Sequence, residues 1–423
     1  MIKRDFYLNQ IIERMWNGNI KVITGIRRGG KSTLLFYLFK EYLLSTGVNK
    51  DNIIEIELDK RKYFKFRNPL YLCNYVENII KKNKNEKYYL FIDEIQFTKK
   101  VKDQESEIEV SVYDMLNELK AYSNLDCYVT GNNSKMLSTD IATEFRGKSS
   151  QIKVYPLSFS EFYSHRGGVA SDALDEYMLY GGMPGLISEP TTERKRAYLK
   201  NLIEEIYIKD LVEHARVQRQ DVLEEILDYL ASSIGSLTNA NKITGTINTK
   251  SSIKISDDTV SKYLKHMIDA FLISEARRYD VKGKRYFDYP NKYYYSDIGL
   301  RNVRLNYRQI DLGHIMENII YNELIRRGYS VDVGIVEDRR KESKKMKEID
   351  FIVNDFDKKI YIQSALKMDE QEKKETELDS LKLTGDFFKK IVIRNDIPTS
   401  FYDDEGILHC KLIDFLLNQV ELF

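Results

Sequence analysis

A glycine-rich run that ends in lysine and serine is the part of this chain whose residue types most clearly could do chemistry. Residues 25–32 read Gly-Ile-Arg-Arg-Gly-Gly-Lys-Ser and match the pattern G-x-x-x-x-G-K-[ST] in full. In this pattern, backbone N–H groups surround a phosphate chain, the lysine reaches the β- and γ-phosphates, and the hydroxyl binds Mg²⁺. We therefore predict an ATP and Mg²⁺ site in which Lys31 and Ser32 have these roles. The predicted nucleotide-binding residues are Gly25, Ile26, Arg27, Arg28, Gly29, Gly30, Lys31, Ser32 and Thr33.

Two adjacent acids end a second apolar segment, Tyr88-Tyr-Leu-Phe-Ile-Asp-Glu94. Asp93 would lie at the tip of a strand beside the Mg²⁺, and Glu94 would polarise the water that attacks the γ-phosphate. Such a segment also occurs as an ordinary solvated strand end. Downstream of a complete phosphate loop, however, it is typical of a Walker B motif.

The order of strand and helix patterns predicts how these motifs are held. The apolar, β-branched residues 20–24 precede the glycine loop, and a helical pattern follows it. Alternation of this kind through residues 1–155 predicts an α/β fold, with a parallel sheet and helices on both faces. Ligands of such sheets bind at the C-terminal strand ends, where both motifs fall. The expected strands are 20–24, 52–58, 88–92, 126–130 and 151–155.

The pattern changes after Pro156 and becomes helical to about Val217. Residues 221–300 read as helices followed by an aromatic, basic hairpin around Gly283, which indicates a winged helix-turn-helix. Residues 313–423 read as a helix followed by strands. We therefore expect an ATPase core at 1–156, a helical lid at 157–217, a winged helix-turn-helix at 218–305 and a further α/β domain at 306–423.

Composition limits the class of protein. A chain of 423 residues predicts two or three domains. The net charge is +1, so any surface for nucleic acid must be local. Cys73, Cys127 and Cys410 are far apart and have neither a disulfide nor a metal-binding spacing. The N-terminus has no signal-peptide pattern, and no run approaches the roughly 20 apolar residues that span a membrane. A cytoplasmic location without a membrane partner is expected.

Five segments together make the chain similar to a known family. They are Gly25–Ser32, Phe91–Gln96, Val129–Ser134, Pro156–Phe162 and Tyr180–Pro184. With them, nearly the whole chain resembles the prokaryotic AAA-type P-loop ATPases whose C-terminal half combines a winged helix with a restriction-endonuclease-like domain of unknown function. The resemblance implies an AAA-type parallel sheet with a helical lid, and Mg²⁺-dependent ATP hydrolysis.

The resemblance also implies further catalytic residues. Asn132 or Asn133 follows the fourth strand and matches the sensor position, where a polar side chain orients the attacking water or contacts the γ-phosphate. The register between the two is open, and an ordinary Asn-rich turn is the alternative. Arg146 lies where an arginine finger could reach the nucleotide of a neighbouring chain, which would require a homo-oligomer. A surface arginine in a loop is the alternative.

The expected winged helix offers a surface for a partner. Its basic residues could contact DNA phosphates. Winged helices also bind proteins, so DNA and an unknown protein partner both remain open. The basic residues are Lys262, Lys265, His266, Arg277, Arg278, Lys282, Lys284 and Arg285.

The last domain departs from the active nuclease pattern, which needs an acid on one strand and E-x-K on the next. Glu317 matches an acid on the first helix, and Asp350 matches the strand acid. Gln363 stands where glutamate is expected and Ala365 where lysine is expected. A neutral amide is a poorer Mg²⁺ ligand than a carboxylate, so we expect a degenerate domain that does not cleave DNA. The alternative is that Lys367, two residues further on and on the same face of an ideal strand, substitutes for the lysine.

The favoured hypothesis is therefore an ATP hydrolase coupled to a C-terminal module that docks DNA or protein. A nucleotide-gated switch with slow turnover is the second hypothesis. An ATP-regulated nuclease is the third.

Overall fold

The computed structural model describes residues 2–103, 107–131, 149–214, 219–250, 254–338, 345–368 and 378–423. The chain divides into two compact units. The first comprises Met1–Pro156 with Asp269–Phe271, and the second comprises Leu157–Ile268 with Leu272–Phe423. The predicted sensor and finger residues, Asn132, Asn133 and Arg146, lie outside the described residues.

The first unit is built on a five-stranded sheet in the order β2-β3-β6-β1-β7. Every neighbouring pair in it is parallel, which confirms the predicted α/β class. The strands are β1 (Ile20–Gly25), β2 (Ile53–Glu57), β3 (Tyr88–Asp93), β6 (Leu125–Thr130) and β7 (Ser149–Val154). Outside this sheet, β4 (Val101–Lys102) pairs antiparallel with β5 (Glu109–Val110).

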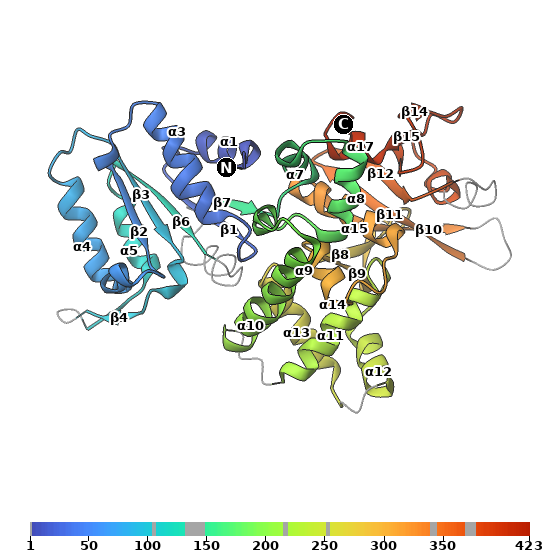
Figure 1. Cartoon of the computed structure of the whole chain (residues 1–423), viewed down its shortest axis with the longest axis horizontal. Helices are drawn as coiled ribbons and strands as arrows, with labels where there is room; N and C mark the ends of the chain where they lie inside the picture. The colour runs from blue at the N-terminus through green and yellow to red at the C-terminus, as the bar shows by residue number, and fades with distance from the viewer. Residues whose placement is uncertain are drawn as a thin grey trace. The chain divides into compact units, whose positions relative to one another are not determined.

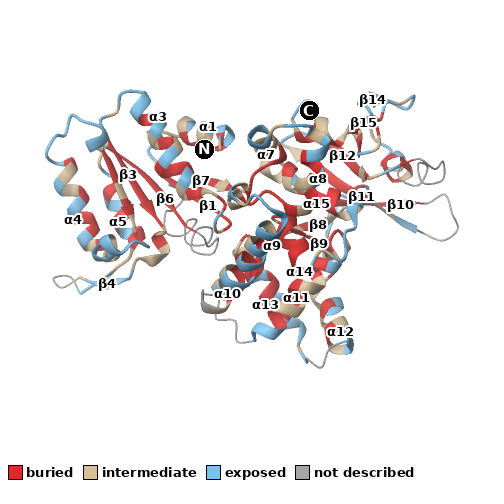
Figure 2. Ribbon diagram, viewed as in Figure 1, coloured by how far each residue is buried: buried red, intermediate tan, exposed pale blue. Residues whose placement is uncertain are grey.

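Helices cover both faces of this sheet because its strands are apolar on both faces. Val22 of β1 belongs to a buried cluster with α4 and α5, whereas the next residue, Ile23, packs with α1 and the helical segment that follows the glycine loop. Figure 1 shows the helices on both sides of the sheet, and Figure 2 shows that the strands between them are buried. The helices are α1 (Asp5–Glu13), α2 (Lys31–Thr33), α3 (Lys40–Ser45), α4 (Pro69–Ile80) and α5 (Val112–Leu119), with a π-helical stretch at Leu34–Phe39.

The second unit contains an eight-stranded mixed sheet in the order β14-β15-β13-β12-β11-β10-β8-β9. Its strands are β8 (Ile273–Asp280), β9 (Arg285–Tyr295), β10 (Ser330–Asp338), β11 (Lys345–Asp355), β12 (Lys358–Ala365), β13 (Lys389–Arg394), β14 (Phe401–Tyr402) and β15 (Leu408–Lys411). Its helices are α7 (Phe159–Arg166), α8 (Ala170–Tyr180), α9 (Thr192–Asn201), α10 (Lys209–His214), α11 (Gln220–Ser232), α12 (Ala240–Lys250), α13 (Asp257–Asp269), α14 (Ile298–Arg304), α15 (Leu312–Arg326) and α17 (Leu412–Leu416).

The hairpin expected as a wing is present as β8 and β9, which pair antiparallel. It is not a free wing, because β8 also pairs in parallel with β10. The hairpin is therefore the edge of the eight-stranded sheet, and strands on both sides of residue 305 share that sheet. The boundaries of the four expected domains remain predictions.

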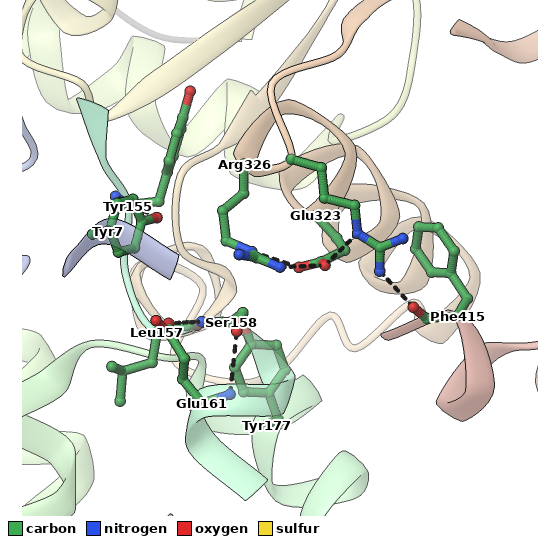
Figure 3. A network of polar contacts seen from close by, with 10 residues as sticks. Tyr7, Tyr155, Leu157, Ser158, Glu161, Tyr177, Glu323, Arg326 and Phe415 are labelled. Atoms are coloured by element: carbon green, nitrogen blue, oxygen red, sulfur yellow. Dashed lines mark hydrogen bonds and ion pairs between the residues drawn. The ribbon is translucent and has the colours of Figure 1, made fainter. Parts of the chain in front are cut away.

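Two of the family segments meet inside the second unit. Ser158 caps α7 and forms a capping box with Glu161, and the Tyr177 hydroxyl donates to the Leu157 carbonyl at 2.8 Å (Figure 3). The Gly182 carbonyl accepts from the Leu157 N–H at 2.8 Å. A Cβ at Gly182 would lie 2.2 Å from the Leu157 carbonyl oxygen, so this contact requires glycine.

The glycine turn is also tied to α14. Asp297, which caps α14, accepts from the Gly182 N–H at 2.7 Å and from the Gly299 N–H at 2.9 Å. Burial raises the pKa of Asp297 to about 6, against the opposing effect of these backbone hydrogen bonds. The glycines of this turn are thus explained by packing within the second unit.

Within the described ranges, no helix is both long and apolar enough to cross a membrane.

Candidate nucleotide-binding site

The glycine loop leaves β1 at a point where a side chain would not fit. Gly25 has φ 139°, and a Cβ there would lie 2.0 Å from the carbonyl oxygen of Val154 on β7. Gly30, at φ 98°, directly precedes the helix that begins at Lys31. The loop backbone is therefore shaped by two left-handed glycines, and its N–H groups precede a helix N-terminus, the arrangement that binds phosphate.

Lys31 is buried, with 4% of the residue exposed, and its ammonium contacts the loop itself. Nζ donates to the carbonyl oxygens of Gly25 and Ile26, each at 2.9 Å. Burial lowers the pKa of Lys31 to about 8, although Glu94 and Asp93 oppose the shift. These partners are uncharged, so a phosphate oxygen can replace them at a net electrostatic gain.

Asp93, at the tip of β3, accepts hydrogen bonds from two hydroxyl groups. Ser32 Oγ donates to Asp93 Oδ1 at 3.0 Å, and Thr130 Oγ1 donates to the same oxygen. Burial raises the pKa of Asp93 to about 6, and the hydrogen bonds from the two hydroxyls partly oppose this. A carboxylate beside a serine hydroxyl at the end of a phosphate loop is a donor set that fits Mg²⁺. Ser32 and Asp93 remain the predicted ligands of the ion.

Glu94 follows Asp93 in a strained conformation. Its φ of 57° lies in the left-handed region, which is uncommon for a residue other than glycine. Its N–H donates to Thr130 Oγ1 at 3.1 Å, and its carboxylate accepts from the side-chain amide of Gln96. The turn thus separates the two adjacent acids, with Asp93 buried toward Ser32 and Glu94 held by Gln96.

The strand order explains why Thr130 reaches both acids. β6 lies between β1, which carries the glycine loop, and β3, which carries the acids. Because the strands are parallel, the C-terminal tip of β6 lies beside the tip of β3. Thr130, the last residue of β6, is therefore between the loop and the acids.

Three residues near this site were missed by the sequence reasoning. Thr130 lies in the quoted Val129–Ser134 segment, so its position was a usable signal, and Gln96 likewise ends Phe91–Gln96. Arg4 had no motif around it. Its guanidinium donates to the carbonyl oxygens of Gly29 at 3.1 Å and Tyr155 at 2.8 Å, which ties the N-terminal segment to the loop.

The other predicted loop residues contribute less to the described geometry. Arg27 is half-buried, whereas Arg28 and Thr33 are exposed. Ile26 is buried and contributes its backbone carbonyl to Lys31.

The basic residues expected to contact DNA are mostly exposed in the second unit, with one exception. His266 is buried, with 7% of the residue exposed, so its inclusion in a phosphate-contacting surface was wrong. The physical reason is the helical phase, because His266 shares the inner face of α13 with Tyr263 and Met267. Arg278 is half-buried, and the exposed residues are Lys262, Lys265, Arg277, Lys282, Lys284 and Arg285.

Comparison with known proteins identifies the class to which this fold and site belong. Residues 17–163 match the family described as "AAA domain", and residues 171–311 match "Domain of unknown function (DUF8612)". The first unit is thus an AAA-type P-loop fold.

Two relatives match along nearly the whole chain. An uncharacterized protein of Haemophilus influenzae is 33% identical, over 99% of this chain and 99% of its own length. The uncharacterized protein MJ1544 of Methanocaldococcus jannaschii is 26% identical, over 96% of this chain and 87% of its own length. The chain therefore belongs to one family with the H. influenzae protein.

The similar solved structures are more distant in sequence. The Walker-type ATPase PABY2304 of Pyrococcus abyssi is similar over 72% of this chain and 96% of its own, with 14% identity and a TM-score of 0.48. AMPPCP-bound DnaA from Aquifex aeolicus is similar over 64% of this chain and 87% of its own, with 15% identity and a TM-score of 0.30.

Proposed function

We propose that the first unit binds ATP with Mg²⁺ and hydrolyses it by in-line attack of water on the γ-phosphate. The observation that carries this proposal is the convergence of Ser32 and Thr130 on Asp93 beside the buried ammonium of Lys31. The match to an AAA domain supports it.

The proposed role of each residue follows from its position in the site. Lys31 and the loop N–H groups hold the phosphates, and Ser32 with Asp93 holds the Mg²⁺, which would neutralise charge on the phosphates. Glu94 orients the water or takes its proton. Asn132 or Asn133 as sensor, and Arg146 as a finger acting between chains, complete the proposal as predictions.

The test is phosphate release by the purified chain with ATP and Mg²⁺, compared with its Glu94→Gln variant. We expect steady turnover that the variant loses while it still binds ATP. Equal turnover in both proteins would show that Glu94 is not the base.

The contact between Gln96 and Glu94 favours a second candidate, a nucleotide-gated switch. While the Gln96 amide holds the Glu94 carboxylate, that carboxylate is engaged and turnover is slow. A Gln96→Ala variant separates the candidates. Faster turnover than the unmodified chain indicates a switch held back by Gln96, whereas slower turnover indicates that Gln96 positions the base.

The partner of the second unit is proposed from its exposed basic residues. The α13 lysines 262 and 265, together with Lys284 and Arg285 at the hairpin, provide cations that can contact phosphates of DNA. ATP turnover measured with and without duplex DNA tests whether the two units are coupled. Stimulation supports coupling, and a protein partner is the alternative if DNA has no effect and does not bind.

A further inference from the structure

A second group of charged side chains is buried in the second unit. At its centre is Lys292 of β9, whose side chain is only 2% exposed. Lys292 Nζ lies 2.8 Å from Glu317 Oε1 on α15, 2.6 Å from Glu348 Oε1 and 3.6 Å from Asp350 Oδ1, both on β11. We call these three acids the carboxylate cluster.

The cluster is further organised by neutral donors. The Tyr294 hydroxyl donates to Glu317 Oε1 at 2.6 Å. Because Lys292 and Tyr294 are two residues apart on β9, they face the same side and meet Glu317 together. Asp350 accepts from the Ser364 N–H at 2.8 Å, and the Asp350 N–H donates to Gln363 Oε1 at 3.2 Å.

Three members of this group are the residues that the sequence aligned with a nuclease metal site, namely Glu317, Asp350 and Gln363. The lysine of that pattern is replaced by Ala365, which is buried in β12, and Lys367 is exposed. The lysine is thus missing from β12, but Lys292 enters from the hairpin and supplies a positive charge beside Glu317 and Asp350.

The electrostatics keep Lys292 charged. Burial lowers its pKa, but Glu317, Asp350 and Glu348 outweigh this and raise the pKa well above its ordinary value. Burial and the neighbouring Glu317 raise the pKa of Asp350 well above its ordinary range, and the Lys292 ammonium opposes this shift. An ammonium has three donors and no acceptor, which suits a group of carboxylates.

Burial also argues against a working metal site. Glu317 and Asp350 side chains are 8% and 11% exposed, and the Lys292 ammonium already lies between them. A divalent ion would have to displace a charged group that contacts the same oxygens.

We propose that the Lys292 ammonium is the resident cation of the carboxylate cluster in place of a divalent metal, and that it thereby fastens the β8–β9 hairpin to α15 and β11. A divalent-cation site is latent beneath it. Removing the ammonium exposes oxygen ligands of the kind that Mg²⁺ and Mn²⁺ bind.

The test measures Mn²⁺ binding by electron paramagnetic resonance, without nucleotide, in the full-length chain and in variants. Lys292→Ala is expected to gain about one Mn²⁺ per chain, as one oxygen-ligand site allows. The double variant Lys292→Ala/Asp350→Asn is expected to lose that gain. Lys282→Ala, at an exposed lysine of the same hairpin, is the matched control and is expected to bind as the unmodified chain does. Comparison between variants cancels any ion bound by Ser32 and Asp93.

Thermal unfolding gives a second readout. The midpoint of Lys292→Ala is expected to fall and to rise again with Mn²⁺, whereas the double variant does not respond. No gain of Mn²⁺ in folded Lys292→Ala would overturn the latent site. If Lys292→Ala does not fold even with Mn²⁺, Mn²⁺ binding is compared between the unmodified chain and the single variant Asp350→Asn. Equal Mn²⁺ binding supports an internal cation, and weaker binding by Asp350→Asn shows that the native cluster already takes a metal.

Discussion

Each unit of this protein buries a lysine near carboxylates, but the two lysines have opposite electrostatic surroundings. Lys31 donates to two backbone carbonyls, and burial lowers its pKa to about 8. Lys292 contacts three carboxylates, which raise its pKa well above the ordinary value despite burial. A buried lysine with neutral partners gains by meeting an anionic ligand, whereas one already surrounded by acids has little to gain. This is the difference expected between the phosphate-binding role that we propose for Lys31 and a structural role for Lys292.

Removing each ammonium in turn by substitution is the most direct test of this comparison. Lys31→Ala is expected to abolish ATP binding with little loss of stability, because the ammonium that it removes donates to backbone carbonyls and its burial disfavours the charge, as the lowered pKa shows. Lys292→Ala is expected to lower the free energy of unfolding by about 3–5 kcal/mol, because it leaves buried carboxylates without their counter-charge. Its ATP affinity should be unchanged.

Calorimetric ATP binding and urea unfolding on both variants check this double contrast. Loss of ATP affinity in Lys292→Ala, at a concentration of denaturant where it is folded, would mean that the two sites are not independent.

The acids of the first unit can be separated in the same way. Glu94→Gln is expected to lower turnover by about 10²–10⁴-fold, the usual worth of a general base, and to leave ATP affinity nearly intact. Glu109→Gln, at an exposed acid of β5, serves as the control. Turnover is measured by phosphate release under saturating ATP.

The pH dependence sharpens the contrast for the binding lysine. Asp93 must be ionised to hold Mg²⁺, and its pKa is about 6, so kcat/KM should fall below that pH. Lys31 must be protonated to hold phosphate, and its pKa is about 8, so kcat/KM should fall above that pH. The plot of kcat/KM against pH should therefore be bell-shaped, with kcat/KM changing by about tenfold per pH unit on each side. A profile that stays flat across both values would contradict these assignments.

Substitution of Thr130 is expected to have a smaller effect on kcat/KM. Thr130→Val removes one donor to Asp93, and a hydrogen bond to a charged group is worth about 1.5–3 kcal/mol, so kcat/KM should fall by roughly 10–100-fold. The acid limb of the pH profile should also move to higher pH, because Asp93 loses a bond that favours its charged form. Thr130→Ser keeps the hydroxyl and should behave nearly as the unmodified chain. An unshifted acid limb in Thr130→Val would show that the contact has no role.

The smallest effect concerns the surface of the second unit. Changing Lys262, Lys265, Lys284 and Arg285 to glutamate should weaken DNA binding for all sequences alike. It should reduce the slope of log affinity against log salt by about 0.9 for each lost phosphate contact. Fluorescence anisotropy across a salt series measures this. If the unmodified chain binds no DNA, the basic surface serves a protein partner.

Sequence alone was sufficient where the information is local. The glycine loop, the Asp93-Glu94 pair and the strands that carry them follow from residue type and spacing over a few positions. Their parallel arrangement follows from the alternation of strands and helices. The structure confirms the α/β class and brings Lys31, Ser32 and Asp93 together, as the motifs predicted.

Only the tertiary structure decided which distant residues complete each site. Thr130 meets Asp93 because β6 lies between β1 and β3, an order that the chain sequence does not state. His266 is buried because of its helical phase in α13, which a count of basic residues ignores. Lys292 lies in a hairpin that the sequence assigned to a wing, and it reaches the carboxylate cluster because β8 pairs with β10. Local patterns specify elements and motifs, whereas contacts between strands far apart in the chain depend on strand order and on the face that each side chain occupies.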